Sequence, residues 1–317
     1  MCSSDLTAAN TSSASATTIA PSTTVAPDPV MPLTGEPITD PALAARPAVV
    51  VKVGNYDAHA QRGMNQADIV YEELINANMS RFAFVFQSRT AKEVGPIRSG
   101  RRQDVDLLGS LNKPIFAWAG GNPTVTKIIK SSDLIDLSQF KCHGSCYRVT
   151  DDVVPYNLVF NVERIYQLSL PGAGRPPQQF RYLTKGEKAA GAASPGVDVR
   201  MDSYKVSWEW NARKGHYERT QNGWSDLNWD RTRATTDNVV VLEMVYKPGI
   251  SNSPDAQSIG SGTAWVFTAG HMVKGTWSRS DRLQPFTLTA ADGSPIKLTP
   301  GRTFIELPRA GNTTPKH

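Results

Sequence analysis

The sequence predicts an α+β fold, in which an N-terminal domain of layered α/β type precedes a smaller, β-rich antiparallel domain. In the first half, short apolar runs typical of buried strands alternate with segments that carry helix start signals. In the second half, apolar and polar residues alternate along runs that glycine-containing turns separate. Residues 170–196 are rich in proline, glycine and alanine, and the domain junction is placed there. The expected domains are therefore 31–190 and 191–311, after a tether at 1–30.

The tether is predicted from composition. Residues 1–30 consist mostly of serine, threonine, alanine and proline, and Asp5 and Asp28 are their only charged side chains. Such a segment has too little apolar area to offset the entropy lost on ordering, so we expect it to be disordered.

Composition and charge also exclude some classes of partner and cofactor. The net charge is +5 over 317 residues, but both signs are mixed along the chain and no long block of lysine and arginine occurs. Nucleic acid is therefore not an expected partner. No run of 18 apolar residues is present, so no helix is expected to cross a membrane. No nucleotide-binding glycine pattern occurs either, and no cofactor is expected.

The first domain is built from apolar runs. The run from Phe82 to Gln87 is apolar on nearly both sides, which predicts a central strand. Val125, Ile128 and Ile129 share one side of a short predicted helix. The expected elements, in order, are strands at 48–53, 68–74 and 82–87, a helix after Ser99, a strand at 114–119 and a helix at 122–130.

An arginine-rich stretch precedes the first of these helices. Ser99 is a favourable N-cap residue, because its hydroxyl can accept a hydrogen bond from a free amide of the first turn. Arg98, Arg101 and Arg102 crowd the same helix start, where each positive charge costs roughly 0.3–1 kcal/mol. Something negative is expected to offset them: Asp104 or Asp106, a carboxylate elsewhere in the chain, or an anionic ligand.

Three further features could contribute to an anion site. Gly120 and Gly121 end the predicted strand at 114–119, and ligands gather at strand ends beside glycine turns. Tight packing of strand and helix is the alternative. Glu72 and Arg81 flank two predicted strands, which could bring them together near Arg98 at the end of the sheet. They would then form a structural salt bridge, or place a carboxylate for acid/base chemistry.

Two cysteines lie close together at Cys142 and Cys146. In an exported protein this pair can close a small disulfide around Gly144. A metal site that includes His143 is the alternative, but zinc sites need four ligands and no second cysteine–histidine cluster occurs. No metal site is therefore expected.

The second domain is predicted to be a set of hairpins. Tyr204–Trp210 alternates apolar with polar residues, which is typical of a half-buried antiparallel strand. Six of the seven tryptophans lie in this half. They could form a sugar-stacking surface or fill the core, and Trp208 and Trp210 lie on the apolar face. The other expected features are strands at 216–221, 239–245 and 303–307, a hairpin of 263–268 with 271–277, a hairpin turn at 292–293, and a long loop at 247–262.

Several motifs carry a resemblance to a known family. The sequence resembles the YerB-type lipoproteins, a bacterial family of undefined function, from Met31 to about Pro308. The motifs are MPLTG (31–35), QADIVYE (66–72), RFAFVFQS (81–88), GPIRSGR (95–101), WAGGNP (118–123) and KGTW (274–277).

The resemblance implies a location. In this family a lipidated cysteine follows an export signal and precedes a flexible spacer, which implies that Cys2 is the acylated anchor. Only Met1 precedes Cys2, so we expect the sequence to begin at a processed or shortened N-terminus. Several acyl chains on one cysteine would hold the protein firmly on the bacterial cell membrane, outside the cytoplasm, whereas a single chain would not.

The expected function is binding. We expect an accessory role toward an anionic or glycan component of the envelope, or toward an envelope protein. The alternative is a hydrolase or transferase acting on an envelope polymer, with Glu72 or Asp104 as acid/base and Arg98 and Arg101 holding an anion. The sequence indicates no particular oligomeric state. The candidate site residues are Arg98, Ser99 and Arg101, with Glu72, Arg81, Gly120 and Gly121.

Overall fold

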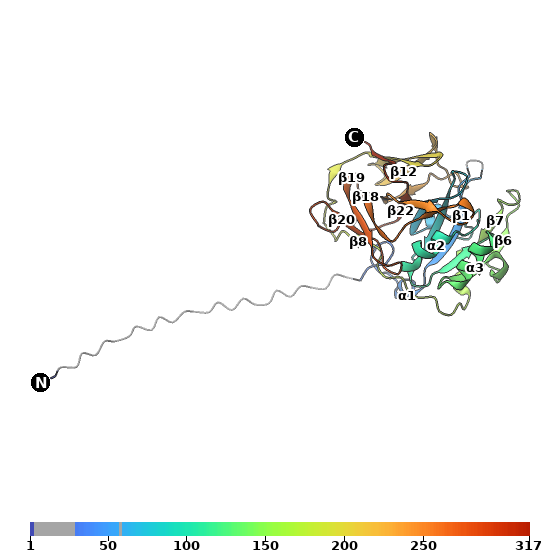
Figure 1. Cartoon of the computed structure of the whole chain (residues 1–317), viewed down its shortest axis with the longest axis horizontal. Helices are drawn as coiled ribbons and strands as arrows, with labels where there is room; N and C mark the ends of the chain where they lie inside the picture. The colour runs from blue at the N-terminus through green and yellow to red at the C-terminus, as the bar shows by residue number, and fades with distance from the viewer. Residues whose placement is uncertain (3–28, 57–58) are drawn as a thin grey trace.

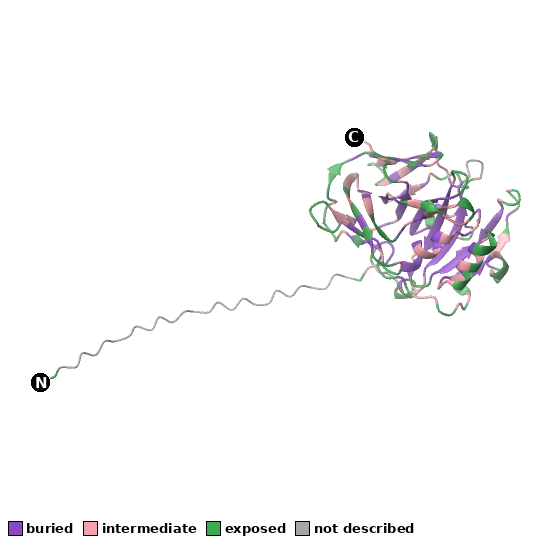
Figure 2. Ribbon diagram, viewed as in Figure 1, coloured by how far each residue is buried: buried purple, intermediate pink, exposed green. Residues whose placement is uncertain are grey.

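The computed structural model describes residues 1–2, 29–56 and 59–317 (Figure 1). The expected tether at 1–30 lies almost wholly outside these residues. The body is organised around one large sheet, and Figure 2 shows buried residues concentrated along its strands. Within the described part of the chain, no helix combines the length and the apolar character that a membrane crossing requires.

The central sheet has eleven strands in the order β20-β19-β18-β15-β22-β2-β3-β1-β4-β5, with β9 beside β19. The pairings make it a mixed sheet, in which β1, β2, β4, β5, β15 and β22 run in one direction and β3 runs against them. The α+β class is thereby confirmed. The strands are β1 (Val49–Gly54), β2 (Ile69–Leu74), β3 (Ser80–Phe86), β4 (Ile115–Trp118), β5 (Ile135–Ser138), β9 (Ala192–Ala193), β15 (Asn238–Leu242), β18 (Gly260–Thr268), β19 (His271–Arg279), β20 (Thr287–Ala290) and β22 (Thr303–Leu307).

The predicted strands of the first half are present within one or two residues. β3 is buried at every position, as its apolar run predicted, and it lies between β2 and β1. Phe82 and Phe84 pack into the hydrophobic cluster on one face, while Ala83 and Val85 pack into the cluster on the other.

Part of the second half joins the central sheet instead of forming a separate domain. β22 lies between β2 and β15 and is parallel to both, with Phe304 opposite Val70 and Val239. The sequence predicted this strand as the last of a separate antiparallel domain, and in this respect the prediction was wrong. All five residues of β22 are buried, which suits a strand inside a sheet that is covered on both faces.

A second, smaller sheet covers one face of the central sheet. Its alternating strand β11 turns Val206 and Trp208 inward, as predicted, and the Trp208 ring lies 4.8 Å from that of Phe304. A short hairpin and a helix cover the rest of this face. The elements are β10 (Gly196–Met201), β11 (Tyr204–Asn211), β12 (His216–Gln221), β13 (Trp224–Ser225), β14 (Thr235–Thr236) and β23 (Thr313–Pro315), then β6 (Cys146–Arg148), β7 (Leu158–Phe160) and α4 (Val162–Gln167).

Helices cover the other face, on which Figure 1 shows α2 and α3. The helix predicted at 122–130 is α3 (Pro123–Ser131), where the Asn122 side chain accepts a hydrogen bond from the Thr124 amide at 2.8 Å. Val125 and Ile129 are buried beneath it. The remaining elements are α1 (Pro41–Ala45), α2 (Arg102–Leu107), η1 (Met64–Gln66), η2 (Gly109–Leu111), η3 (Gln139–Lys141), η4 (Ile250–Asn252), β8 (Arg181–Tyr182), β16 (Tyr246–Pro248), β17 (Pro254–Ala256) and β21 (Lys297–Leu298).

Two local predictions were wrong. Ser99 is not the N-cap of α2, because that helix begins at Arg102 with Arg101 in the N-cap position. The carboxylate of Asp104 caps it by accepting a hydrogen bond from the Arg101 amide at 2.6 Å. The expected loop at 247–262 contains the hairpin of β16 with β17, whose backbone pairing its polar composition did not indicate.

Candidate functional site

The candidate site lies at one edge of the central sheet. Because β1, β2, β4 and β22 run in the same direction, their carboxyl ends meet at this edge. The segment 96–98 lies beside the end of β1. There the Gly54 amide donates to Pro96 O at 2.8 Å, and the Arg98 amide donates to Lys52 O at 2.9 Å. The Ala119 amide donates to Arg98 O at 3.0 Å. Arg98 is therefore fixed between the ends of β1 and β4.

Three arginines gather near Tyr56. Arg98 Nε donates to the Tyr56 hydroxyl at 3.0 Å, and its guanidinium lies 4.9 Å from the Tyr56 ring and 4.5 Å from that of Tyr156. Arg81 Nη1 donates to the backbone oxygen of Ser99 at 2.8 Å. Arg101 donates to backbone oxygens and to the Asn76 side chain. Arg81, Arg98 and Arg101 are called the arginine cluster below.

The arginine cluster lacks direct counter-charges. Among the described residues, no carboxylate lies within salt-bridge distance of any of its three members. Arg81 is only 7% exposed, and the buried Nε atoms of Arg81 and Arg101 have no hydrogen-bond partner in that part of the chain. Burial, and after it the charge of Arg101, lowers the pKa of Arg81 to about 10. An anion that binds here would relieve this repulsion.

A small cavity adjoins the cluster. It has a volume of about 270 Å³. Arg102 also lines it but is paired with Asp106, so this arginine is compensated within the chain. Gly120 lies at the same strand end, where a Cβ atom would come within 3.5 Å of Ser99 Oγ. Of the residues predicted from sequence, Ser99, Arg101 and Gly121 line the cavity, together with Asn76, Asn122 and Asp255.

Glu72 does not belong to this group. Its side chain points to the opposite face of the sheet, where it is fully buried and bound by Arg219 and Ser80. The expected pairing of Glu72 with Arg81 was wrong, because alternate residues of a strand face opposite sides and Glu73 is the residue opposite Arg81.

Glu73 belongs to a buried group of charges beneath the arginine cluster. Lys52 bonds to both Glu73 and Asp104, and all three side chains are fully buried. Burial, and after it the charge of Asp104, raises the pKa of Glu73 to about 7. Since Glu72 and Asp104 are both enclosed, neither can reach a substrate as the acid/base that the enzyme hypothesis requires.

The cysteines are found in two states. Cys142 and Cys146 form a disulfide, with 5.7 Å between their Cα atoms. Cys2 is free and exposed. In the ranges that the structure describes, no group of three or more histidine, cysteine or acidic side chains could hold a metal ion.

Sequence analysis missed an aromatic hollow on the other side of Tyr56. Trp224 and Trp229 are exposed there and line a cavity of about 810 Å³. The available signal was the dipeptide Asn222–Gly223 directly before Trp224, because it predicts a tight hairpin that leaves the next side chain at the surface.

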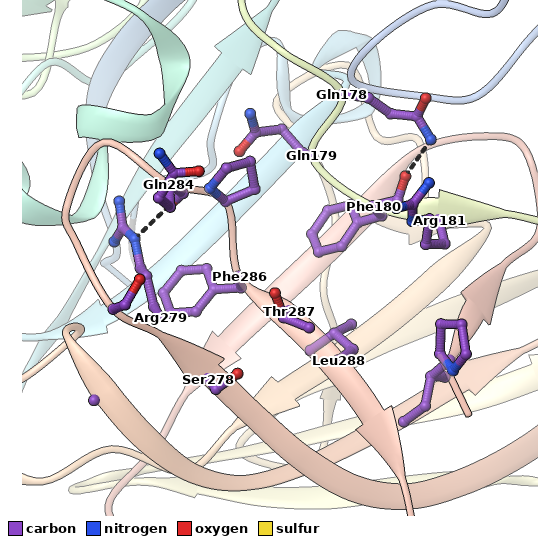
Figure 3. Close-up of a pocket in the computed structure, with 15 residues that line it drawn as sticks. Gln178, Gln179, Phe180, Arg181, Ser278, Arg279, Gln284, Phe286, Thr287 and Leu288 are labelled. Atoms are coloured by element: carbon purple, nitrogen blue, oxygen red, sulfur yellow. Dashed lines mark hydrogen bonds between the residues drawn. The ribbon is translucent and has the colours of Figure 1, made fainter. Parts of the chain in front are cut away.

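A third cavity, of about 790 Å³, lies between β8 and β20 (Figure 3). Two of its polar side chains are bonded to backbone oxygens of the protein. Gln178 donates to Phe180 O at 2.6 Å, and Arg279 Nε donates to Gln284 O at 2.7 Å.

Comparison with known proteins gives the family. Residues 33–173 match the model described as "Protein of unknown function (DUF3048) N-terminal domain", and residues 197–305 match the model of the C-terminal domain of the same family. The chain belongs to this family. The break between the two models falls within 174–196, close to the junction expected from composition.

One relative is "Putative lipoprotein YerB" of Bacillus subtilis, which is 25% identical over 289 residues, or 87% of this chain and 85% of that protein. A solved structure, described as the crystal structure of the YerB protein from Bacillus subtilis, matches with a TM-score of 0.79 at 22% identity. The match covers 91% of this chain and 99% of that one. The resemblance to the YerB-type lipoproteins is thereby confirmed.

Proposed function

We propose that the protein is a lipid-anchored binding protein of the bacterial envelope, which holds a phosphate- or carboxylate-bearing polymer at the arginine cluster. One observation carries the proposal. Three guanidinium groups meet at one sheet edge, and among the described residues no carboxylate pairs with them. Guanidinium groups bind phosphate and carboxylate through paired, charge-assisted hydrogen bonds, so the expected ligand is anionic.

The proposed location rests on the relative and on Cys2. The relative's printed name is that of a lipoprotein, and the free, exposed Cys2 supplies a thiol for acylation. The net charge of +5 adds long-range attraction toward a polyanion.

The geometry favours binding over catalysis. The acid/base chemistry considered from the sequence needs a carboxyl group that a substrate can touch, and Glu72 and Asp104 are both fully enclosed. The arginine cluster supplies hydrogen-bond donors and charge, which are sufficient for binding.

The test is a titration with two purified polymers, wall teichoic acid as a polyol phosphate and polygalacturonate as a polycarboxylate. Arg98→Ala and Arg101→Ala should each weaken the binding of at least one polymer about tenfold, the loss expected of one charge-assisted hydrogen bond. Arg213→Ala removes an exposed arginine outside the site and should leave affinity within about twofold. Unchanged binding of both polymers by both cluster variants, or no binding by the native protein, would overturn the proposal.

A further inference from the structure

The hollow beside Tyr56 is built from both halves of the chain. Gln61 and Asp151 line it from the first half, and Trp224, Asp226 and Trp229 line it from the second. This set of residues is called the aromatic cleft below. The volume of the cleft, about 810 Å³, is that of a small-ligand pocket. A protein partner would instead bury a broad surface, with an area of about 800 Å² on each side.

The aromatic cleft contains two tryptophans that are far more exposed than the tryptophans of the core. Trp224 is 81% exposed and Trp229 is 47% exposed, while Trp208 and Trp277 are almost wholly enclosed. Val153, which is 62% exposed, lines the same hollow. Exposed apolar side chains scattered singly need no explanation, but three that share one concavity indicate a binding surface.

The Trp229 indole and the backbone at Trp224 are held in place. The Trp229 amide donates to Gln61 O at 2.9 Å, and the guanidinium of Arg62 lies 3.8 Å from the Trp229 ring. Trp224 follows a two-residue turn in which Asn222 and Gly223 both have positive φ angles, so its backbone position is fixed by a tight hairpin. A fixed indole loses little freedom when a ligand covers it.

Two carboxylates of the cleft have their charge compensated by buried arginines. Asp151 binds the buried Arg62 at 2.6 Å, and Asp226 binds the buried Arg219. A third carboxylate, Asp152, lies 3.0 Å from His59 Nδ1. Asp151 and Asp226 can therefore accept hydrogen bonds from hydroxyl groups without requiring a positively charged ligand.

We propose that the aromatic cleft binds an uncharged glycan chain. A sugar ring presents an apolar C–H face, which stacks on an indole, and a rim of hydroxyl groups, which donate to carboxylates at the edge of the ring. The cleft places both kinds of partner around one hollow. This site goes beyond the proposed function and does not rest on it, although Tyr56 lines the cleft and also accepts the hydrogen bond of Arg98.

The experiment titrates the protein with chitohexaose and with cellohexaose, two uncharged oligosaccharides, by calorimetry and tryptophan fluorescence. Native protein should bind at least one of them, with a shift of the indole emission. Trp224→Ala should lose at least about tenfold in affinity, and the double variant with Trp229→Ala should show no measurable heat. Phe140→Ala removes an equally exposed aromatic ring outside the cleft and should bind as the native protein does.

Trp224 is so exposed that its removal should leave the fold intact, which circular dichroism would verify. No binding of either oligosaccharide at millimolar concentration would overturn the proposal, and so would native-like binding by the double variant. Because both probes are uncharged, this result is independent of the teichoic acid and polygalacturonate titrations.

Discussion

Glu72 and Glu73 are neighbours in β2, yet their carboxylates lie on opposite faces of the central sheet, where Glu72 binds Arg219 and Glu73 binds Lys52. Each face therefore contains a buried group of charges. The group around Arg219 joins the second sheet to the first, because Arg219 comes from β12 and Glu306 comes from β22. The group around Lys52 lies beneath the arginine cluster.

The first prediction concerns Arg219. Burial alone would lower the pKa of this guanidinium, but Glu72 and Asp226 outweigh burial and raise it, so the group stays charged. Arg219→Met would leave buried carboxylates without their cation. The free energy of unfolding should fall by about 3–5 kcal/mol in urea denaturation followed by circular dichroism.

Glu306→Gln is the matched control. Burial, and after it the charge of Glu72, raises the pKa of Glu306 well above its ordinary value, which favours the protonated form. Glutamine keeps an oxygen that can accept from Trp208 Nε1, now at 2.9 Å. The Glu306→Gln substitution should lower the free energy of unfolding by less than about 1 kcal/mol, because the polar group keeps its hydrogen bond. A Glu306→Gln variant as unstable as Arg219→Met would contradict this account.

The second prediction concerns pH. The pKa of Glu73 is about 7 in the folded protein, against an ordinary value of 4.5. Between these values the folded state binds more protons than the unfolded state, so the Glu73 contribution to the free energy of unfolding decreases as pH rises. Glu73→Gln mimics the protonated form. It should match the native protein near pH 4 and exceed it by roughly 2–3 kcal/mol at pH 8.

Urea denaturation of both proteins across this pH range measures the difference. If the two stability curves run parallel, Glu73 does not titrate in this window.

The third prediction concerns Gly275, in the motif KGTW. A Cβ atom at Gly275 would lie 2.1 Å from the Thr289 backbone oxygen of the paired strand β20. Gly275→Ala should therefore force β19 and β20 apart and cost about 2–3 kcal/mol. Gly186→Ala is the control, because Gly186 has a positive φ of 84° but open space around it. The Gly186→Ala variant should lose only about 1–2 kcal/mol of stability. Equal losses in thermal denaturation would show that contact with β20 is not the reason for glycine here.

The fourth prediction concerns the disulfide. Cys142 and Cys146 are four residues apart, so their bond closes a very short loop and restricts the unfolded chain only slightly. In a Cys2→Ser background, replacing both cysteines with serine should lower the free energy of unfolding by about 2 kcal/mol. The variant should remain folded and cooperative by circular dichroism. A loss several times larger would mean that the bond holds packing beyond its own loop.

Local pattern predicted most elements of the first half. The run from Phe82 to Phe86 identified a central strand, and Asn122 with Pro123 identified the start of α3, because these signals lie within a few residues of one another. The pairing of β22 with β2 joins segments more than 200 residues apart, and no local pattern carries that information.

The candidate site was predictable in part. The positive charge at 98–102 was visible in the sequence, but the direction of each side chain depends on strand pairing. Glu72 was therefore expected beside Arg81, and only the strand register identifies Glu73 as the residue opposite Arg81. The Asn222–Gly223 turn was a signal for Trp224. Trp229 could not be separated from the core tryptophans, because it lies outside the regular strands whose alternation predicts burial.

β22 follows every other strand of the central sheet in sequence, yet it lies fifth in the sheet, with neighbours on both sides. Because β22 is the last of these strands to be synthesised, the edges of β2 and β15 stay open until residues 303–307 are available. The central sheet therefore cannot close while the chain is incomplete. A copy cleaved before Thr303 would keep both edges open, and it should associate with other such copies rather than persist as a monomer.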